Sequence, residues 1–279
     1  MDILTNGTYF GQNDFTYQKG GIHLTETVYT HPRVDWHFHE NAYITLLLCG
    51  GMREGNKKEE YQCVPGTILY HHWQDAHYNI KEPRFTKGFH IEISSGLFNK
   101  WDYDKGKKEG SYRLMHPEAK LLIYKLLYEL KGDDEISDLA IESLVTHLFS
   151  VIHDNPSAIK EKQPAWVRQV EMLLHDPVAG PITLEGLASA VDRHPVYISR
   201  TFHQYFGCHL GDYLRWIKLG RVLETMSNKK VSLSSLAHEA GFADQSHFIK
   251  NFKSYFPLNP SKFRKGINRS FSKVNTIQF

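Results

Sequence analysis

Two histidines separated by a single residue, His37 and His39, have a spacing that suits the binding of a metal ion or a small ligand. They lie in the segment "VDWHFHENAYITLLLCGG", whose β-branched and aromatic residues favour a strand. Side chains of a strand alternate between its two faces, so both imidazoles would project from one face. Two neutral imidazoles there could ligate Zn²⁺ or Fe²⁺, contact a small ligand, or pack in a core. The residues alone leave these three uses open.

A second candidate site lies in residues 241–264, "GFADQSHFIKNFKSYFPLNPSKFR". Helical spacing puts its large aromatic side chains on one face, which must be buried. The opposite face carries amide, hydroxyl, imidazole and ammonium groups near the start of the helix: Gln245, Ser246, His247 and Lys250. Such groups can reach base edges in the major groove of double-stranded DNA, and the backbone amides there can hold phosphates.

The segment around this helix is the second copy of an internal repeat. "ITLEGLASAV" at 182–191 matches "VSLSSLAHEA" at 231–240, and "ISRTFHQYFG" at 198–207 matches "FIKNFKSYFP" at 248–257. The offset is 49 residues before the turn and 50 after it, which indicates two copies of one helix-turn-helix unit. In the first copy the exposed side is expected to carry Val196, Tyr197, Ser199 and Arg200.

The segment between the copies, "GDYLRWIKLGRVLETM", predicts one helix of about 16 residues, roughly 24 Å long. A helix of that length could hold two recognition helices about one DNA turn apart, roughly 34 Å. One protomer would then read two successive major-groove segments.

Charge is distributed unevenly along the chain. Residues 1–163 hold 18 Lys and Arg against 23 Asp and Glu, a net −5, whereas residues 164–279 hold 15 against 8, a net +7. A basic C-terminal half beside an acidic N-terminal half suggests that only the C-terminal half meets a polyanion.

The region from about Trp166 to Lys265 resembles the DNA-binding domain of the AraC/XylS family of bacterial transcription regulators. The resemblance rests on "LSSLAHEAGFADQSHFIKNFKSYFPLNPSKFR", with its "GF", its "QSHF" helix start and its "NPSKFR" close. It implies that Val196, Ser199 and Arg200 contact bases, with Gln245, Ser246, His247 and Lys250 as their counterparts. The chain departs from the family at "VDRH", where glycine is frequent in the first turn, and at Pro257, where glycine usually follows the last aromatic.

The first hundred residues predict an all-β sandwich or barrel, because "AYITLLL", "GTILYHH" and "FTKGFHIEI" are short β-type runs separated by turn residues. They resemble the small cupin-type barrel that many members of this family carry as a regulatory domain. In metal-binding cupins the matching ligands would be His37, His39 and His77, but Tyr43 and Ile44 stand where a glutamate is expected.

The expected pocket of this barrel combines aromatic and imidazole side chains, which would suit a sugar or another small organic effector. Its predicted lining is Trp36, His37, His39, Tyr43, Tyr70, Trp73, His77 and His90. We expect no cofactor and no resident metal. The alternatives are a metal-dependent cupin enzyme tethered to DNA, and a regulator whose ligand-free barrel serves only for dimerisation.

The predicted multidomain plan combines an all-β cupin-like barrel, a helical pair and an all-α domain with two helix-turn-helix motifs. Its bounds are 1–115 for the barrel, 116–153 for the helical pair, 154–165 for a polar linker and 166–279 for the DNA-binding domain. The resemblance implies that the helical pair makes a homodimer contact. The expected function is a ligand-responsive transcription regulator, with a DNA operator and a small-molecule effector as partners and no enzymatic activity.

Several classes of protein are disfavoured by composition. The three cysteines are far apart and odd in number, so no disulfide framework is predicted. The first residues lack a basic segment followed by an apolar block, and the longest apolar run, Ala42 to Cys49, is far shorter than the roughly 20 residues of a membrane helix. We therefore expect a cytoplasmic protein without a membrane partner.

Overall fold

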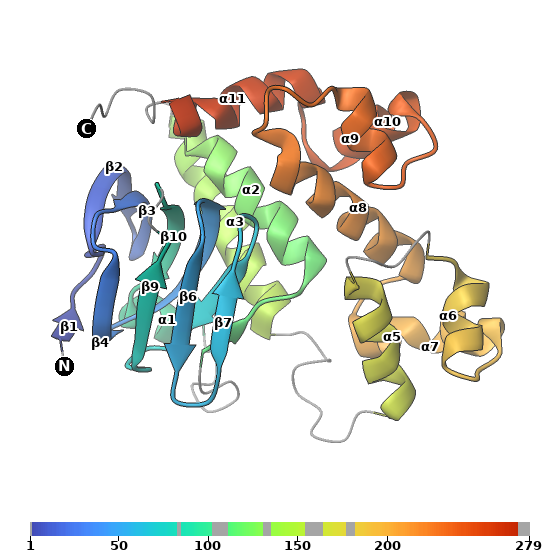
Figure 1. Cartoon of the computed structure of the whole chain (residues 1–279), viewed down its shortest axis with the longest axis horizontal. Coiled ribbons are helices and arrows are strands. Elements are labelled where there is room, and N and C mark those ends of the chain that lie inside the picture. Colours follow the sequence, from blue (N-terminus) through green and yellow to red (C-terminus); the bar gives the residue numbers. More distant parts are fainter. Residues whose placement is uncertain are drawn as a thin grey trace. The chain divides into compact units, whose positions relative to one another are not determined.

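The computed structural model describes residues 2–82, 85–101, 111–130, 135–153, 164–176 and 182–272 (Figure 1). These residues form two compact units. The β unit comprises Met1–Met115 and Glu129–Ser143, and the helical unit comprises His116–Tyr128 and Leu144–Phe279. Most of the predicted linker, residues 154–163, lies outside the described residues.

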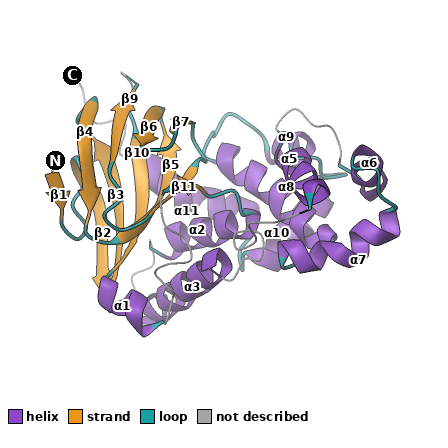
Figure 2. Cartoon of the chain, turned by 90° about the horizontal axis from the view of Figure 1, so that it is seen from below, coloured by secondary structure: helices purple, strands orange, loops and turns teal. Residues whose placement is uncertain are grey.

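The β unit contains two sheets (Figure 2). The first sheet has the order β1-β4-β9-β6-β7. Its strands are β1 (Asp2–Leu4), β4 (Arg33–His39), β9 (His77–Lys81), β6 (Met52–Asn56) and β7 (Glu60–Cys63). The second sheet has the order β11-β8-β5-β10-β3-β2. Its strands are β11 (Tyr112–Arg113), β8 (Ile68–His71), β5 (Ala42–Cys49), β10 (Lys87–Ile93), β3 (Ile22–Tyr29) and β2 (Gly11–Lys19).

Strand pairing in the β unit is antiparallel except between β1 and β4, which run parallel. The three runs that predicted strands correspond to β5, β8 and β10, which pair side by side with Ile44 opposite both Tyr70 and Ile91. A short helix, α1 (Ser95–Lys100), follows β10. The predicted all-β character of this half of the chain is therefore confirmed.

Buried polar bonds fasten the N-terminal segment over the sheets. The Glu92 carboxylate on β10 accepts hydrogen bonds from the Gly7 amide at 2.8 Å and from Asn41 Nδ2 at 2.9 Å. It also accepts one from the Tyr9 hydroxyl at 3.3 Å. Tyr9 thereby lies parallel to the imidazole of His90, with ring centroids 3.7 Å apart. This contact brings the loop before β2 into the interior of the β unit.

The first repeat occupies α5 (Ala165–His175), α6 (Leu184–Ala190) and α7 (Pro195–Phe206). The Thr183 side chain caps α6 by accepting a hydrogen bond from the Gly186 amide. The His194 imidazole caps α7, and Pro195 takes the first helical position, where its missing N–H has no partner to lose. The turn between these helices contains Asp192 at a φ of 50°, a left-handed conformation.

The second repeat follows α8 (Leu210–Met226) and comprises α9 (Leu233–Glu239) and α10 (Gln245–Tyr255), with α11 (Pro260–Ser272) closing the chain. Ser232 caps α9, and Asp244 caps α10 through a 2.7 Å hydrogen bond from the His247 amide. Gly241 ends α9 at a φ of 83°, which glycine adopts without a Cβ penalty. The predicted duplicated helix-turn-helix architecture is present.

Helices α2 (Pro117–Glu129) and α3 (Glu135–His153) are divided between the two units, with boundaries after Tyr128 and after Ser143. Helix α2 packs within the helical unit. Lys120 pairs with Glu224 of α8, and the Tyr128 ring stacks on Phe263 of α11 with centroids 5.2 Å apart. The second repeat therefore shares part of its packing with a helix that precedes it by about 100 residues.

Within the described part of the chain, no helix combines the length and the apolar character needed to span a lipid bilayer.

Candidate functional site

The interior of the β unit contains a small polar cavity between its two sheets. Its lining is made of aromatic, imidazole and a few charged or amide side chains: Leu4, Tyr9, Phe10, Tyr29, His37, His39, Tyr43, Thr45, Glu54, His77, Asn79, Lys81 and His90. The space free for an occupant is about 20 Å³. Because one water needs roughly 10 to 15 Å³ by the same measure, the cavity as it stands admits a water or an ion rather than a sugar.

The histidines of this cavity are held in defined orientations by backbone carbonyls. His37 Nδ1 donates to the Asp35 carbonyl at 2.8 Å, and His77 Nδ1 donates to the Asp75 carbonyl at 3.1 Å. A carbonyl can only accept, so Nε2 of a neutral imidazole keeps its lone pair. His77 Nε2 is 3.0 Å from the Tyr43 hydroxyl, which therefore donates to it.

Burial keeps these imidazoles neutral. It lowers the pKa of His77 to about 3, and the neighbouring His37 adds to this effect. It also lowers the pKa of His90 to about 3, with a contribution from Lys81. Burial is also the main reason why the pKa values of His39 and His71 fall well below the ordinary value for histidine. Neutral imidazole is the form that can accept a hydrogen bond or ligate a metal ion.

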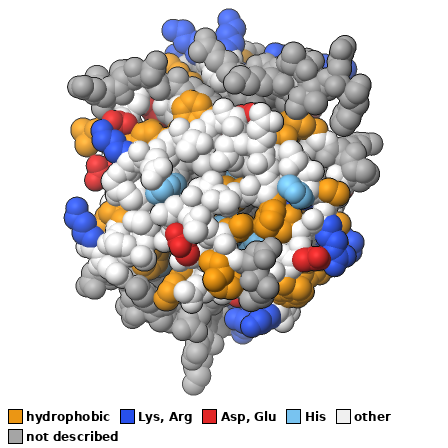
Figure 3. All heavy atoms as spheres, turned by 90° about the vertical axis from the view of Figure 1, so that its left-hand side faces the viewer, with side chains coloured by type: hydrophobic (Ala, Val, Ile, Leu, Met, Phe, Trp, Pro, Cys, Tyr) orange, Lys and Arg blue, Asp and Glu red, His pale blue; other side chains and the backbone are white. Residues whose placement is uncertain are grey.

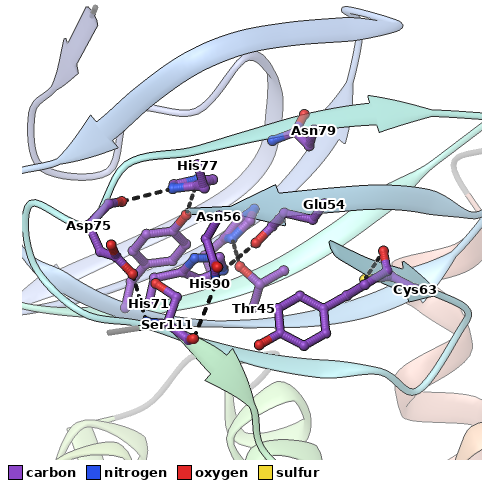
Figure 4. Close-up of polar contacts among 12 residues, drawn as sticks. Thr45, Glu54, Asn56, Cys63, His71, Asp75, His77, Asn79, His90 and Ser111 are labelled. Carbon is purple, nitrogen blue, oxygen red and sulfur yellow. Dashed lines mark hydrogen bonds and ion pairs between the residues drawn. The ribbon is translucent and has the colours of Figure 1, made fainter. Parts of the chain in front are cut away.

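The cavity also contains a buried acidic group, Glu54, and a buried basic group, Lys81. Burial raises the pKa of Glu54 on β6 to about 8, and the nearby Lys81 partly offsets this. Burial lowers the pKa of Lys81 on β9 to about 8, and Glu54 offsets that shift in turn. Glu54 also approaches His71, with Oε1 and Nε2 3.4 Å apart (Figure 4). The interior can therefore exchange protons when an occupant changes its charge.

Five of the eight predicted pocket residues line the cavity, namely His37, His39, Tyr43, His77 and His90. Trp36 does not: it precedes His37 and lies on the opposite face of β4, is 42% exposed and packs edge-on against Tyr78. Tyr70 is buried on β8 but lies outside the lining, and its ring stacks with Tyr112.

Trp73 lies in a separate surface hollow together with His72 and Asp75. Sequence reasoning missed Glu54, Lys81 and Tyr9, which reach the cavity from β6, from β9 and from the loop before β2. No local signal pointed to Glu54, because its strand "MREGN" contains no β-branched or aromatic residue.

Figure 3 shows one face of the molecule on the side of the β unit. Among the side chains coloured in Figure 3, hydrophobic and histidine groups are scattered over a mostly uncharged face, with Lys and Arg toward its edge. Among the described residues visible there, the Lys and Arg side chains stand apart from one another and form no continuous basic patch.

The start of α7 presents the side chains predicted for the first recognition helix. Val196, Tyr197, Ser199 and Arg200 are all exposed, while Ile198 between them is fully buried. Tyr197 also touches the Trp166 ring edge-on, with centroids 5.7 Å apart. This face therefore combines apolar, hydroxyl and guanidinium groups.

The start of α10 presents the second predicted set. Gln245, Ser246, His247 and Lys250 are exposed, while Phe248 and Phe252 are fully buried. Phe252 packs against Phe256 and Phe263, with ring centroids 4.5 and 5.4 Å away. The aromatic stripe holds the helix in place, and the polar face is left to solvent or to a partner.

Comparison with known proteins gives a family match in this helical region, and several relatives match a part of the chain. The helix-turn-helix domain family matches residues 187–266. The "Msm operon regulatory protein" of Streptococcus mutans is 26% identical over 136 residues, which are 47% of this chain and 49% of that protein. The "Probable transcription factor PqrA" of Proteus vulgaris is 30% identical over 84 residues, 30% of this chain and 69% of PqrA. The match thus spans about half of the Msm regulator.

Similarity to solved structures is weaker. ToxT from Vibrio cholerae O395 is 12% identical at a TM-score of 0.36, with 89% of this chain and 99% of that chain covered. The C-terminal domain of the response regulator yesN from Fusobacterium nucleatum is 25% identical at a TM-score of 0.31, covering 36% of this chain and 93% of that one.

Two capped helix-turn-helix units in one helical unit, joined by α8, define a tandem helix-turn-helix protein. The repeat, the family match and the relationship to PqrA identify the particular group. The chain belongs to the AraC/XylS family of transcription regulators.

Proposed function

We propose that this protein is a sequence-specific, DNA-binding transcription regulator in which α7 and α10 read successive major-groove segments. The observation that carries the proposal is that both helices begin with an exposed face above a buried one. These faces offer a guanidinium, an amide and an ammonium group at Arg200, Gln245 and Lys250. Such groups can hydrogen-bond to base edges or hold phosphates.

The β unit is the regulatory part of this proposal. Its cavity supplies neutral imidazoles, a carboxyl group and an amine in a buried setting, which suits recognition of a small effector. An effector acts only through a difference in its affinity for two arrangements of the protein. The protein works in the cytoplasm, where its operator lies.

The assembly is a homodimer that uses α3. Leu139 on this helix is 71% exposed, which favours a role in contact with another protein surface. Analytical ultracentrifugation of the wild type and of Leu139→Glu tests this point. A wild type that sediments as a monomer at all concentrations would remove the dimer from the proposal.

The central experiment selects genomic fragments with the purified full chain and measures binding to the recovered site by fluorescence anisotropy. Arg200→Ala and Lys250→Ala should each weaken binding by about 1 to 3 kcal/mol, or roughly 5- to 150-fold. Each should also reduce the steepness of the salt dependence if the lost contact is to phosphate.

Lys57→Ala is the matched control, because it removes the same charge from an exposed loop of the β unit. It should leave binding within about twofold, since Lys57 belongs to the β unit, which contains neither reading helix, and exposed charges are screened by salt. Unchanged operator affinity in both Arg200→Ala and Lys250→Ala, with the fold intact by circular dichroism, would contradict the assignment of the reading faces.

A further inference from the structure

Three side chains with metal-binding chemistry converge inside the β unit from three different strands. Glu54 comes from β6, His71 from the end of β8 and His77 from the start of β9 (Figure 4). Each is at most 5% exposed, and one ligand atom of each lies within 4.8 Å of the others. The cluster thus brings two imidazoles and one carboxyl group to a common point.

The distance between Glu54 and His71 fits a shared metal ion better than a hydrogen bond. Their Oε1 and Nε2 atoms are 3.4 Å apart, and neither ring nitrogen of His71 has a hydrogen-bond partner among the described residues. Two ligands of a tetrahedral Zn²⁺ at about 2.0 to 2.1 Å lie roughly 3.4 Å from each other. A buried imidazole without a partner is otherwise destabilising.

His77 is oriented for the same ion. Its Nδ1 donates to the Asp75 carbonyl, the arrangement that commonly fixes the tautomer of a metal-bound histidine. Its Nε2 lone pair is now taken by the Tyr43 hydroxyl at 3.0 Å. Tyr43 also stacks on His71, with ring centroids 4.2 Å apart, so this phenol lies where it could turn aside or become a further oxygen ligand.

The charge and size of the interior favour a small cation. Glu54 is only 5% exposed, and a buried ionised carboxylate is costly unless it is paired with a cation or coordinates a metal ion, so a divalent ion bound to it would offset that cost. Glu54 and His77 line the cavity, whose free space of about 20 Å³ has room for a water ligand of the ion, whereas His71 lies outside the lining and would approach the ion from the side of Glu54.

A second group, His37, His39 and His77, also brings three ligand atoms within 4.8 Å and shares His77 with the first. It contains no carboxylate, and an ion there would keep its full charge in a buried site. His77 cannot serve both groups through Nε2 at once. The group with Glu54 is therefore the better site.

We propose that Glu54, His71 and His77 bind one divalent first-row transition metal ion of the Zn²⁺ or Fe²⁺ type. We further infer, resting on the proposed function, that this ion is an effector of the regulator.

The test is a titration of the chelator-treated full chain with Co²⁺ as a spectroscopic probe, followed by displacement with Zn²⁺. The wild type should bind one ion per chain. Glu54→Gln and His71→Phe keep volume but remove a ligand, and each should weaken Zn²⁺ binding by at least about tenfold, the loss that even outer partners of a ligand can cause.

Two histidine variants serve as controls. His37→Gln belongs to the competing group, and His31→Gln removes an exposed imidazole. His31→Gln should keep Zn²⁺ affinity within about threefold of the wild type. His37→Gln should lose less affinity than Glu54→Gln or His71→Phe, because His37 supplies no ligand although its ring centroid lies 4.2 Å from that of His77. No stoichiometric ion, or a loss in His37→Gln with Glu54→Gln and His71→Phe unaffected, would overturn the proposal.

Wild-type protein gives an answer even if a variant fails to fold. X-ray absorption of the Zn²⁺ complex should show two imidazole ligands with oxygen ligands completing the shell. Three imidazoles would point to the competing group and overturn the assignment.

The effector role is tested separately by measuring operator affinity with Zn²⁺ and with chelator. A change of at least about threefold that is lost in His71→Phe supports it. Metal binding without any change in operator affinity overturns the effector role and leaves the site. Absence of DNA binding in both conditions contradicts the proposed function, whereas the metal titration, which needs no DNA, still decides the site.

Discussion

The two helix-turn-helix repeats share their interior and differ at their turns and exposed faces. Ile198 and Phe202 in the first occupy the places of Phe248 and Phe252 in the second, and all four are fully buried. The turn, by contrast, uses Asp192 at a φ of 50° in the first repeat and Gly241 at a φ of 83° in the second.

The recognition helices are also capped differently. α7 starts from a His194 imidazole that accepts from the Val196 amide at 3.2 Å, and α10 starts from the Asp244 carboxylate at 2.7 Å from its donor. The spacing of apolar residues is common to both repeats and determines the helix-turn-helix fold. The turn residues and the exposed side chains differ between the repeats. Two readers with different faces are expected to prefer different half-sites.

The largest effect should come from emptying the shared interior. Phe202→Ala and Phe252→Ala should each lower the free energy of unfolding by about 3 to 5 kcal/mol, because a fully buried aromatic ring is replaced by a cavity. Chemical denaturation followed by circular dichroism measures the change. If one variant lost less than about 1 kcal/mol of unfolding free energy while the other lost the expected amount, the two interiors would not be equivalent.

The next effect should separate the two reading faces. Gln245→Ala should reduce discrimination at one base pair of the half-site read by α10 by about 1 to 3 kcal/mol, because an amide can bond to a base edge with two atoms. Arg200→Ala should do so only at the half-site read by α7. Selection from a library of randomised operators measures both. Equal loss at both half-sites in either variant would contradict separate readers.

A smaller effect should come from the turn of the second repeat. Gly241→Ala should lower the free energy of unfolding by about 1 to 2 kcal/mol through its left-handed φ. A new Cβ would meet Lys218 Cε at 3.6 Å, an ordinary contact, so the backbone conformation alone sets the cost.

Asp192→Gly is the matched change in the first repeat and should alter the free energy of unfolding by less than about 0.5 kcal/mol. Aspartate tolerates the left-handed region, and glycine loses more entropy on folding. Thermal denaturation compares the two variants. An equal effect of both would mean that the turns are not under different constraints.

The smallest effect should come from the helix caps. Asp244→Ala should lower the free energy of unfolding by about 1 kcal/mol, since it removes the acceptor for the His247 amide. His194→Ala should cost less, because its acceptor bond is longer and Pro195 already presets the first turn of α7. Urea denaturation measures the free energy of unfolding of both variants. A greater decrease in His194→Ala than in Asp244→Ala would contradict this prediction.

Much of this architecture could be predicted from local patterns. The aromatic spacing around Phe252 and the match between repeats predicted both units, and strand alternation put His37 and His39 on one buried face. The same alternation places Trp36 outside the cavity, a consequence that the aromatic composition of the segment obscured.

The remaining parts depend on pairing between distant strands. Glu54 and His71 meet because β6 and β8 belong to two facing sheets, and no spacing along the chain encodes that distance. The packing of Tyr128 on Phe263 is likewise a tertiary contact between segments of ordinary helical pattern. Local periodicity identifies which face is buried but does not identify the partner.

The contact of α2 with α11 bears on how the chain can be cut. Tyr128 lies so close to Gly266 that a Cβ there would be 2.6 Å from its ring, and Lys125 lies over the Phe256 ring at 5.7 Å. A fragment that begins at Trp166 would expose aromatic surface that α2 covers in the full chain. Fragments designed to study the second reader in isolation should therefore retain α2, supplied in cis or added as a peptide.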